Sequence, residues 1–210
     1  MKALLSLQPG DASTLQLLDV ADPVESPDQL LVRVRACGVN YPDALHIQDL
    51  YQVKQKRPFS PGGELCGVVE RVGTNVQGFS PGDLVIGRCG TGAMAEKIAI
   101  AADRCVKIPA DSPVLEAAGL VLTYATAYYA LVDRARLQPG ETLLVLGAAG
   151  GVGCAAIDLA RALGARVVAA ASMQAKLDFA MACGAQDGLV YPTQLEDKAA
   201  QKTLTDRLKA

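Results

Sequence analysis

Hydrophobic and polar positions follow two different patterns along this chain, and the change falls near residue 110. Before it, short alternating or β-branched runs are separated by Gly, Pro and Asp, which is typical of strands joined by tight turns. The first half is therefore predicted to be a β-rich barrel or sandwich. Its expected strands are residues 2–7, 30–36, 65–72, 83–86, 94–100 and 104–108.

Beyond residue 110 the pattern becomes helical and then mixed. Ser112-Pro113 followed by Glu116 predicts a helix start with Pro at the first helical position, and residues 124–132 predict a long apolar helix. After Gly140, strands and helices alternate, which is typical of a parallel sheet with right-handed crossovers. The expected elements are strand 142–146, helix 152–163, strand 166–171, helix 174–182, a short strand 189–191 and a charged helix from about Thr193.

Composition excludes several classes of partner. The 210 residues are 50% hydrophobic and 20% charged, with a net charge of −2, so no broad cationic surface is expected for nucleic acid or an anionic membrane. No apolar run reaches the ~18 residues of a membrane span. The apolar run at the N-terminus stops at Gln8-Pro9, too early for an export signal. We therefore expect a cytoplasmic protein.

The cysteines and the single histidine give no metal or disulfide signal. Six cysteines are spread along the chain with no Cys-x-x-Cys pair, so reduced and mostly buried thiols are expected. The lone His46 cannot build a metal site by itself.

The segment from Gly147 to Gly153 follows an apolar strand and opens a helix, which is the context that a dinucleotide-binding turn requires. Gly150 is expected to let the backbone approach a pyrophosphate, and Gly153 to let the helix pack closely on the strand. The free N–H groups of the first helical turn, which begins with Gly151 and Val152, would face the phosphates. Ala148 replaces the usual first glycine of the motif, a change expected to tilt the turn slightly.

The end of the next strand bears on which nicotinamide cofactor fits. An acidic residue there would bind a free ribose 2′-hydroxyl, but the chain has Ser172, and Asp178 is expected inside the following helix. Ser172 and Lys176 can both donate to a 2′-phosphate, so NADPH is favoured over NADH. The alternative interpretation of Lys176 is a solvated helix residue.

Several separated motifs, in this order along the chain, resemble the medium-chain dehydrogenase/reductase superfamily and within it the zinc-free quinone oxidoreductase (zeta-crystallin-like) branch. They are residues 38–43, 58–64, 67–69, 81–85, 123–131 and 148–153. The resemblance implies an α/β chain with an N-terminal GroES-like β-rich catalytic domain, residues 1–110, and connecting helices, residues 111–140. Residues 141–210 would form the first half of a Rossmann doubly wound parallel sheet, with the active site between the domains.

The resemblance also bears on metal binding. Zinc members of the superfamily hold a catalytic metal with a Cys and a His where this chain has Asn40 and Gly63, and no four-cysteine cluster is present. Because zinc needs several N, S or O ligands, no metal is expected. Without a Lewis acid to stabilise an alkoxide, the expected hydride acceptor is a quinone or an α,β-unsaturated carbonyl.

Site residues follow from the same resemblance. Asn40 is expected beside the nicotinamide, where it can donate to the acceptor carbonyl, and Thr126 is expected to support the nicotinamide end. Tyr41 and Tyr51 would line the substrate cleft or, alternatively, finish the edge of a core. Asp43 is expected to be a helix cap or anchor.

Two further expectations concern the 2′-phosphate of the cofactor and the second half of the dinucleotide-binding fold. Tyr191 would join Ser172 and Lys176 around the 2′-phosphate. A full dinucleotide fold has about six strands, so the first strand here would be an open apolar edge. Either the chain is a fragment of a longer protein, or that edge pairs with another copy; a homodimer is the default in the family.

Three functions remain open from the sequence. The leading one is NADPH-dependent hydride transfer to a quinone without a metal. The second is an NADPH-dependent reductase of 2-enoyl or acryloyl thioesters or of alkenals, which uses the same hydride step. The third is a nucleotide-binding or structural protein without turnover, or an inactive fragment.

Overall fold

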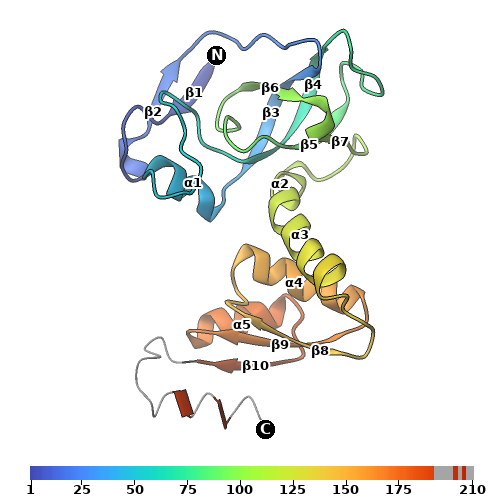
Figure 1. Ribbon diagram of the computed structural model, residues 1–210. Helices are drawn as coiled ribbons and strands as arrows, with labels where there is room; N and C mark the ends of the chain where they lie inside the picture. The colour runs from blue at the N-terminus through green and yellow to red at the C-terminus, as the bar shows by residue number, and fades with distance from the viewer. Residues whose placement is uncertain (192–200, 203–204, 207–210) are drawn as a thin grey trace. The chain divides into compact units, whose positions relative to one another are not determined.

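The chain forms two compact units that follow one another in the sequence, Met1–Leu122 and Thr123–Ala210. The computed structural model describes residues 1–191, 201–202 and 205–206 (Figure 1). The first unit is rich in strands and the second alternates strands with helices, as the hydrophobic pattern predicts. The charged helix expected from about Thr193 falls largely outside the described residues.

A five-stranded antiparallel sheet is the centre of the first unit. Its strand order is β6 (Lys97–Ala101), β3 (Gln29–Gly38), β4 (Glu64–Val72), β5 (Leu84–Arg88) and β7 (Cys105–Lys107). The inward positions of these strands supply a core of branched aliphatic side chains, which stabilises the sheet by removing apolar surface from water. Its members include Leu30, Val32, Leu65, Val69 and Val85.

Smaller elements surround this sheet. β1 (Lys2–Leu5) pairs antiparallel with β2 (Gln16–Asp19), and α2 (Val114–Ala118) packs against β3 and β4. α1 (Tyr41–Ile47) directly follows β3, and the 3₁₀ turns are η1 (Ala12–Thr14) and η2 (Ala102–Arg104). The pattern did not indicate β2 or α1. All four side chains of β2 are exposed and α1 has only 7 residues, so neither carries a usable periodicity.

The helical connection differs in detail from the expectation. Pro113 caps α2 and does not begin it. α3 runs Leu120–Tyr128 and continues as a π-helical segment, η3 (Tyr129–Arg134), so residues 124–132 are helical as expected but change from α to π geometry at Tyr129. A π-helical turn widens the backbone, and an apolar sequence pattern does not reveal it.

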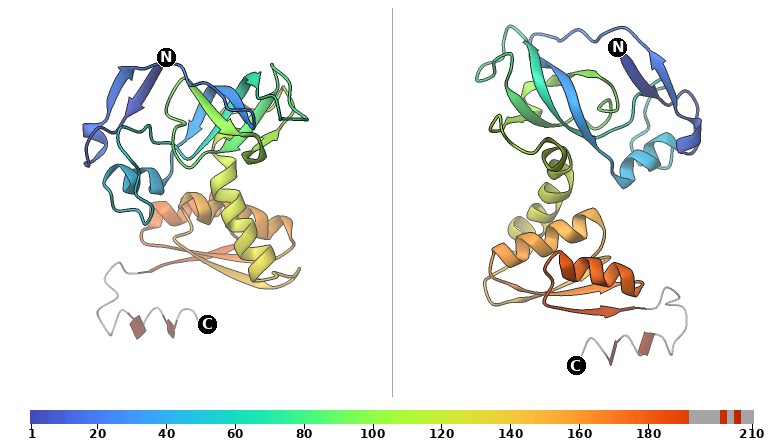
Figure 2. Two further views of the ribbon diagram at one scale, coloured as in Figure 1. Left: turned by 45° about the horizontal axis from the view of Figure 1, so that its top comes forward. Right: turned by 180° about the vertical axis from the view of Figure 1, so that it is seen from behind.

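A three-stranded parallel sheet organises the second unit, in the order β10 (Asp187–Val190), β9 (Arg166–Ala171), β8 (Thr142–Leu146). α4 (Gly151–Ala162) and α5 (Gln174–Ala182) join the strands and lie on the same face of the sheet in both views of Figure 2. β8, β9 and α5 have the predicted bounds. In the described part of the chain β8 is an edge strand, and its Leu146 is 66% exposed.

Candidate functional site

The glycine-rich turn joins the carboxyl end of β8 to the start of α4. Gly147 takes a positive φ of 66°, which a glycine adopts without strain. The Ala148 N–H donates to the Ala170 carbonyl of β9 at 3.1 Å, and the Gly150 N–H donates to the Gly147 carbonyl at 3.0 Å. These bonds hold the turn against the sheet, while Gly150 caps α4.

Helix α4 packs tightly against this turn because residue 153 has no side chain. A Cβ at Gly153 would lie 2.7 Å from the carbonyl oxygens of both Gly147 and Ala148, closer than van der Waals contact allows. The turn is therefore brought close to the N-terminus of a 12-residue helix, whose free N–H groups favour an anion.

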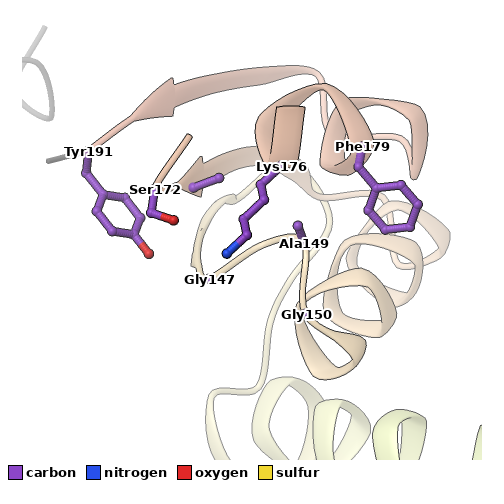
Figure 3. Close-up of a pocket in the computed structure, with 8 residues that line it drawn as sticks. Gly147, Ala149, Gly150, Ser172, Lys176, Phe179 and Tyr191 are labelled. Atoms are coloured by element: carbon purple, nitrogen blue, oxygen red, sulfur yellow. The ribbon is translucent and has the colours of Figure 1, made fainter. Parts of the chain in front are cut away.

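A cavity of about 400 Å³ opens beside the turn. Figure 3 shows the Lys176 side chain pointing toward the glycine turn, with Ser172 and Tyr191 on one side of the lysine and Phe179 on the other. The structure thus brings together Gly150, Ser172, Lys176 and Tyr191 of the expected cofactor residues. Its full lining is Gly147, Ala149, Gly150, Ala171, Ser172, Lys176, Phe179 and Tyr191.

The electrostatics of this cavity favour a negatively charged ligand. Its lining residues include one cation, Lys176, and two hydroxyl groups, but no carboxylate. Lys176 forms no ion pair with any described residue. The nearby acid, Asp178, accepts a hydrogen bond from Gln174 at 2.7 Å. A phosphate in this cavity would meet a free ammonium group and no like charge.

A second cavity, of about 240 Å³, lies within the first unit. It contains two of the residues singled out from the sequence, Asn40 and Tyr51, and the position of Gly63. Its full lining is Asn40, Pro42, Asp43, His46, Tyr51, Gln52, Val53, Gln55, Gly63, Arg88, Gly90 and Leu122.

A partly buried hydrogen-bond network fixes Asn40 at the start of α1. Its Nδ2 donates to Glu64 Oε1 at 2.7 Å, and Glu64 Oε2 accepts from the Leu122 N–H at 2.8 Å. Asp43 accepts from the Asn40 N–H at 2.8 Å and from the Gly62 N–H at 3.1 Å, as expected for a cap and anchor. One Nδ2 hydrogen of Asn40 is thus committed to Glu64, and an amide has a second.

The remaining expected residues separate into two groups. Tyr51 lines the cavity of the first unit, and its ring lies beside that of His46, with 4.5 Å between the centroids. Tyr41 begins α1 but is 76% exposed and does not line the cavity. Thr126 lies on α3, is exposed, and lines neither cavity.

The sequence did not predict a role for Glu64, which binds Asn40, or for His46 and Phe179, which line the cavities of the first and second units. Glu64 is fully buried on β4, directly after Gly63, and no charge pattern distinguishes it from a surface acid. His46 is the single histidine of the chain, and among the described residues no group of side chains forms a metal site around it. Phe179 follows Lys176 by one helical turn and lines the same cavity. That spacing is the one sequence signal that could have identified Phe179.

Metal-binding clusters and membrane-spanning helices were also sought. No group of three or more His, Cys, Asp or Glu side chains able to hold a metal ion occurs among the described residues. No helix in the described ranges is both long and apolar enough to cross a membrane. All six cysteines are free, two of them buried and four half-buried.

Comparisons with known proteins agree with this architecture. The alcohol dehydrogenase GroES-like domain family matches residues 26–110. Quinone oxidoreductase-like protein 2 of Bos taurus is 43% identical over 170 residues, which cover 80% of this chain and 48% of that protein. The chain thus spans about half the length of such relatives.

Solved structures give the same result. A probable oxidoreductase from Mycobacterium abscessus matches with a TM-score of 0.88 at 35% identity, over 100% of this chain and 66% of that one. The quinone oxidoreductase from Thermus thermophilus, also solved as a complex with NADPH, matches with a TM-score of 0.78 at 35% identity, over 91% and 60%. By its motifs, its fold and these relatives, the chain belongs to the quinone oxidoreductase branch of the medium-chain dehydrogenase/reductase superfamily.

Proposed function

We propose that the chain carries the cofactor-binding and acceptor-binding parts of an NADPH-dependent oxidoreductase that transfers hydride to a quinone without a metal. One observation carries the proposal: the glycine turn, Ser172, Lys176 and Tyr191 converge on one cavity that has no carboxylate. A 2′-phosphate fits such a lining, whereas a cofactor with a free 2′-hydroxyl gains nothing from Lys176.

The residues around the turn fit a dinucleotide. Gly150 leaves open space, since the nearest atom to an added Cβ, the Gly147 carbonyl oxygen, is 3.4 Å away. The turn and the first N–H groups of α4 would hold the pyrophosphate, and Ser172, Lys176 and Tyr191 the 2′-phosphate. NADPH, when bound, supplies the hydride; the residues of this chain hold and orient it.

The cavity of the first unit supports a conjugated carbonyl as acceptor. Asn40 is held rigidly by Glu64 and retains a second Nδ2 hydrogen, which can bind a carbonyl oxygen. A hydrogen-bond donor suffices for a quinone, because the charge that arrives with hydride spreads over a conjugated system. An unactivated ketone or alcohol needs stronger stabilisation of the oxyanion than an amide provides.

Cofactor choice is tested by isothermal titration of the 210-residue chain with NADPH and NADH. We expect NADPH to bind at least tenfold more tightly, since the phosphate meets a cation. Ser172→Asp should weaken NADPH by about 1–3 kcal/mol, because it places like charges together in a partly buried site. Ser26→Asp, an exposed position in the first unit, is the matched control and should change neither affinity. Equal or tighter binding of NADH would contradict the assignment.

Turnover is tested by following NADPH absorbance with duroquinone (tetramethyl-1,4-benzoquinone) as acceptor, before and after removal of metals by a chelator. Oxidation of NADPH that survives the chelator is the expected result. Tight NADPH binding with no oxidation would instead favour a nucleotide-binding protein without turnover.

A further inference from the structure

His46 is a buried side chain with an unused hydrogen-bonding atom. It lies in the last turn of α1, is 6% exposed, and lines the cavity of the first unit. Its Nδ1 is the one buried side-chain nitrogen or oxygen in the described ranges that has no hydrogen-bond partner. Leaving a buried polar atom unpaired costs free energy, so such an atom calls for an explanation.

The surroundings of Nδ1 indicate which tautomer the neutral ring adopts. A hydrogen on Nδ1 would be a buried donor with no acceptor, whereas a bare Nδ1 leaves only a lone pair unsatisfied. The favoured neutral form therefore carries its hydrogen on Nε2. Nε2 is not among the buried, unpartnered atoms of the described residues, and His46 lines the cavity, so Nε2–H is the group available to a ligand there.

The charged groups around the cavity leave His46 available to a ligand. The Asp43 carboxylate already accepts two backbone hydrogen bonds, from Asn40 and Gly62. Arg88, the lining cation, is a donor and cannot satisfy Nε2–H. Tyr51 packs its ring beside the imidazole at an interplanar angle of 50°, which fixes the ring by contact.

We propose that Nε2–H of His46 binds the carbonyl oxygen of the acceptor, so that His46 is a substrate-contacting residue of the reaction. The inference rests on the proposed function and adds to it the side chain that selects oxygen-bearing acceptors. Asn40 also lines this cavity, so His46 is its second hydrogen-bond donor suited to a quinone oxygen. The apolar side chains of Val53 and Leu122 accommodate the rest of a small ring.

The first measurement uses the fact that His46 is the single histidine of the chain. Long-range ¹H–¹⁵N spectra of histidine-labelled protein then contain one imidazole, and its nitrogen shifts identify the tautomer directly. We expect the Nε2–H form, and a saturable shift of the Nε2 resonance on titration with duroquinone. Durene, the same ring with no oxygens, should leave that resonance unshifted.

Three substitutions separate the two ring nitrogens. His46→Gln places an amide N–H near the position of Nε2, His46→Asn places one near Nδ1, and His46→Phe has none. We expect His46→Phe and His46→Asn to bind duroquinone about five- to tenfold more weakly, the loss of one hydrogen bond. His46→Gln should stay within about twofold of the wild type, and durene affinity should be the same in all four proteins.

The outcomes distinguish this inference from the function on which it rests. If duroquinone binds and, in asparagine-labelled protein, shifts the side-chain amide resonance of Asn40, while neither the Nε2 resonance nor the His46→Phe affinity changes, the inference is overturned and the proposed function stands. If duroquinone does not bind the wild-type chain while NADPH does, the acceptor assignment and the inference both fail. A variant that does not fold, judged by lost NADPH binding, leaves the wild-type spectra to decide.

Discussion

Two glycines of the turn before α4 have opposite surroundings. A Cβ at Gly153 would lie 2.7 Å from two backbone carbonyl oxygens, which cannot move without distorting the turn. A Cβ at Gly150 would meet its nearest neighbour at 3.4 Å, and its φ of −80° suits any residue. Gly153 is therefore required by the fold itself, whereas Gly150 matters only if a ligand approaches the turn.

This contrast gives a matched pair of substitutions. Gly153→Ala should lower the free energy of unfolding by about 1–3 kcal/mol through overpacking. Gly150→Ala should leave stability nearly unchanged and weaken NADPH at least tenfold, because the methyl group occupies the space that the pyrophosphate needs. Denaturant unfolding and isothermal titration measure the two effects. Unchanged NADPH affinity in Gly150→Ala would move the phosphates away from this turn.

Single residues were predictable where chain order also places them in space. Ser172 and Tyr191 follow β9 and β10, and parallel strands end at the same edge of a sheet, so both meet the glycine turn. His46 and Glu64 were not predictable in this way. Their roles depend on which side chains surround them after α1 and the antiparallel sheet have packed, and no local pattern records that.

The segment between α1 and β4 forms one wall of the acceptor cavity, and one arginine fixes it. Tyr51, Gln52, Val53 and Gln55 of this segment line the cavity. Arg57 Nη1 binds both oxygens of Asp49, at 2.8 and 2.9 Å. Its Nη2 donates to the Ile47 carbonyl at 2.9 Å, and its side chain is only 15% exposed. The wall is thereby tied to the end of α1.

Arg57→Lys should loosen this wall, because the single nitrogen of lysine cannot reproduce the contacts that two guanidinium nitrogens make with the Asp49 carboxylate and the Ile47 carbonyl. We expect about 1–3 kcal/mol lower stability and several-fold weaker binding of duroquinone. Arg71→Lys is the control, because Arg71 also binds Glu25 through two nitrogens but is 54% exposed. It should change neither property. Equal effects of the two substitutions in unfolding and titration experiments would contradict the assigned role of Arg57.

At the scale of elements, the sequence was most informative in the second unit, where apolar runs are separated by turn residues. β8, β9 and α5 have the predicted bounds, and each contributes buried apolar residues to one core, such as Val145, Val167 and Leu177. α1 was missed although it positions Asn40 and His46: it is short, and Asp43 stabilises its first turn by capping. The element that supports the proposed acceptor site thus depends on capping and tertiary contacts more than on periodicity.

At the scale of the whole molecule, burial raises the pKa of cysteine thiols in both units. Burial raises the pKa of Cys37 and Cys105 to about 12 and that of Cys89 and Cys154 to about 11. The ordinary value is 9.0. The first three lie in the first unit and Cys154 lies in the second, so both units contain thiols that stay protonated in the folded chain.

These shifts predict how stability depends on alkaline pH. A thiol in the unfolded chain loses its proton above pH 9.0, whereas the folded chain retains it toward pH 11–12. Ionisation therefore favours the unfolded state, so the stabilisation is complete below pH 9 and lost as the pH rises through the folded values.

We expect the thermal midpoint to be constant from about pH 7 to 8.5 and to fall above about pH 9. Differential scanning calorimetry in steps of pH measures this. Replacing Cys37, Cys89, Cys105 and Cys154 by Ala should flatten the fall, although Cys66 and Tyr124 retain a share of it, because burial raises the pKa of both groups. An equally steep fall in that variant would show that other groups govern the alkaline transition.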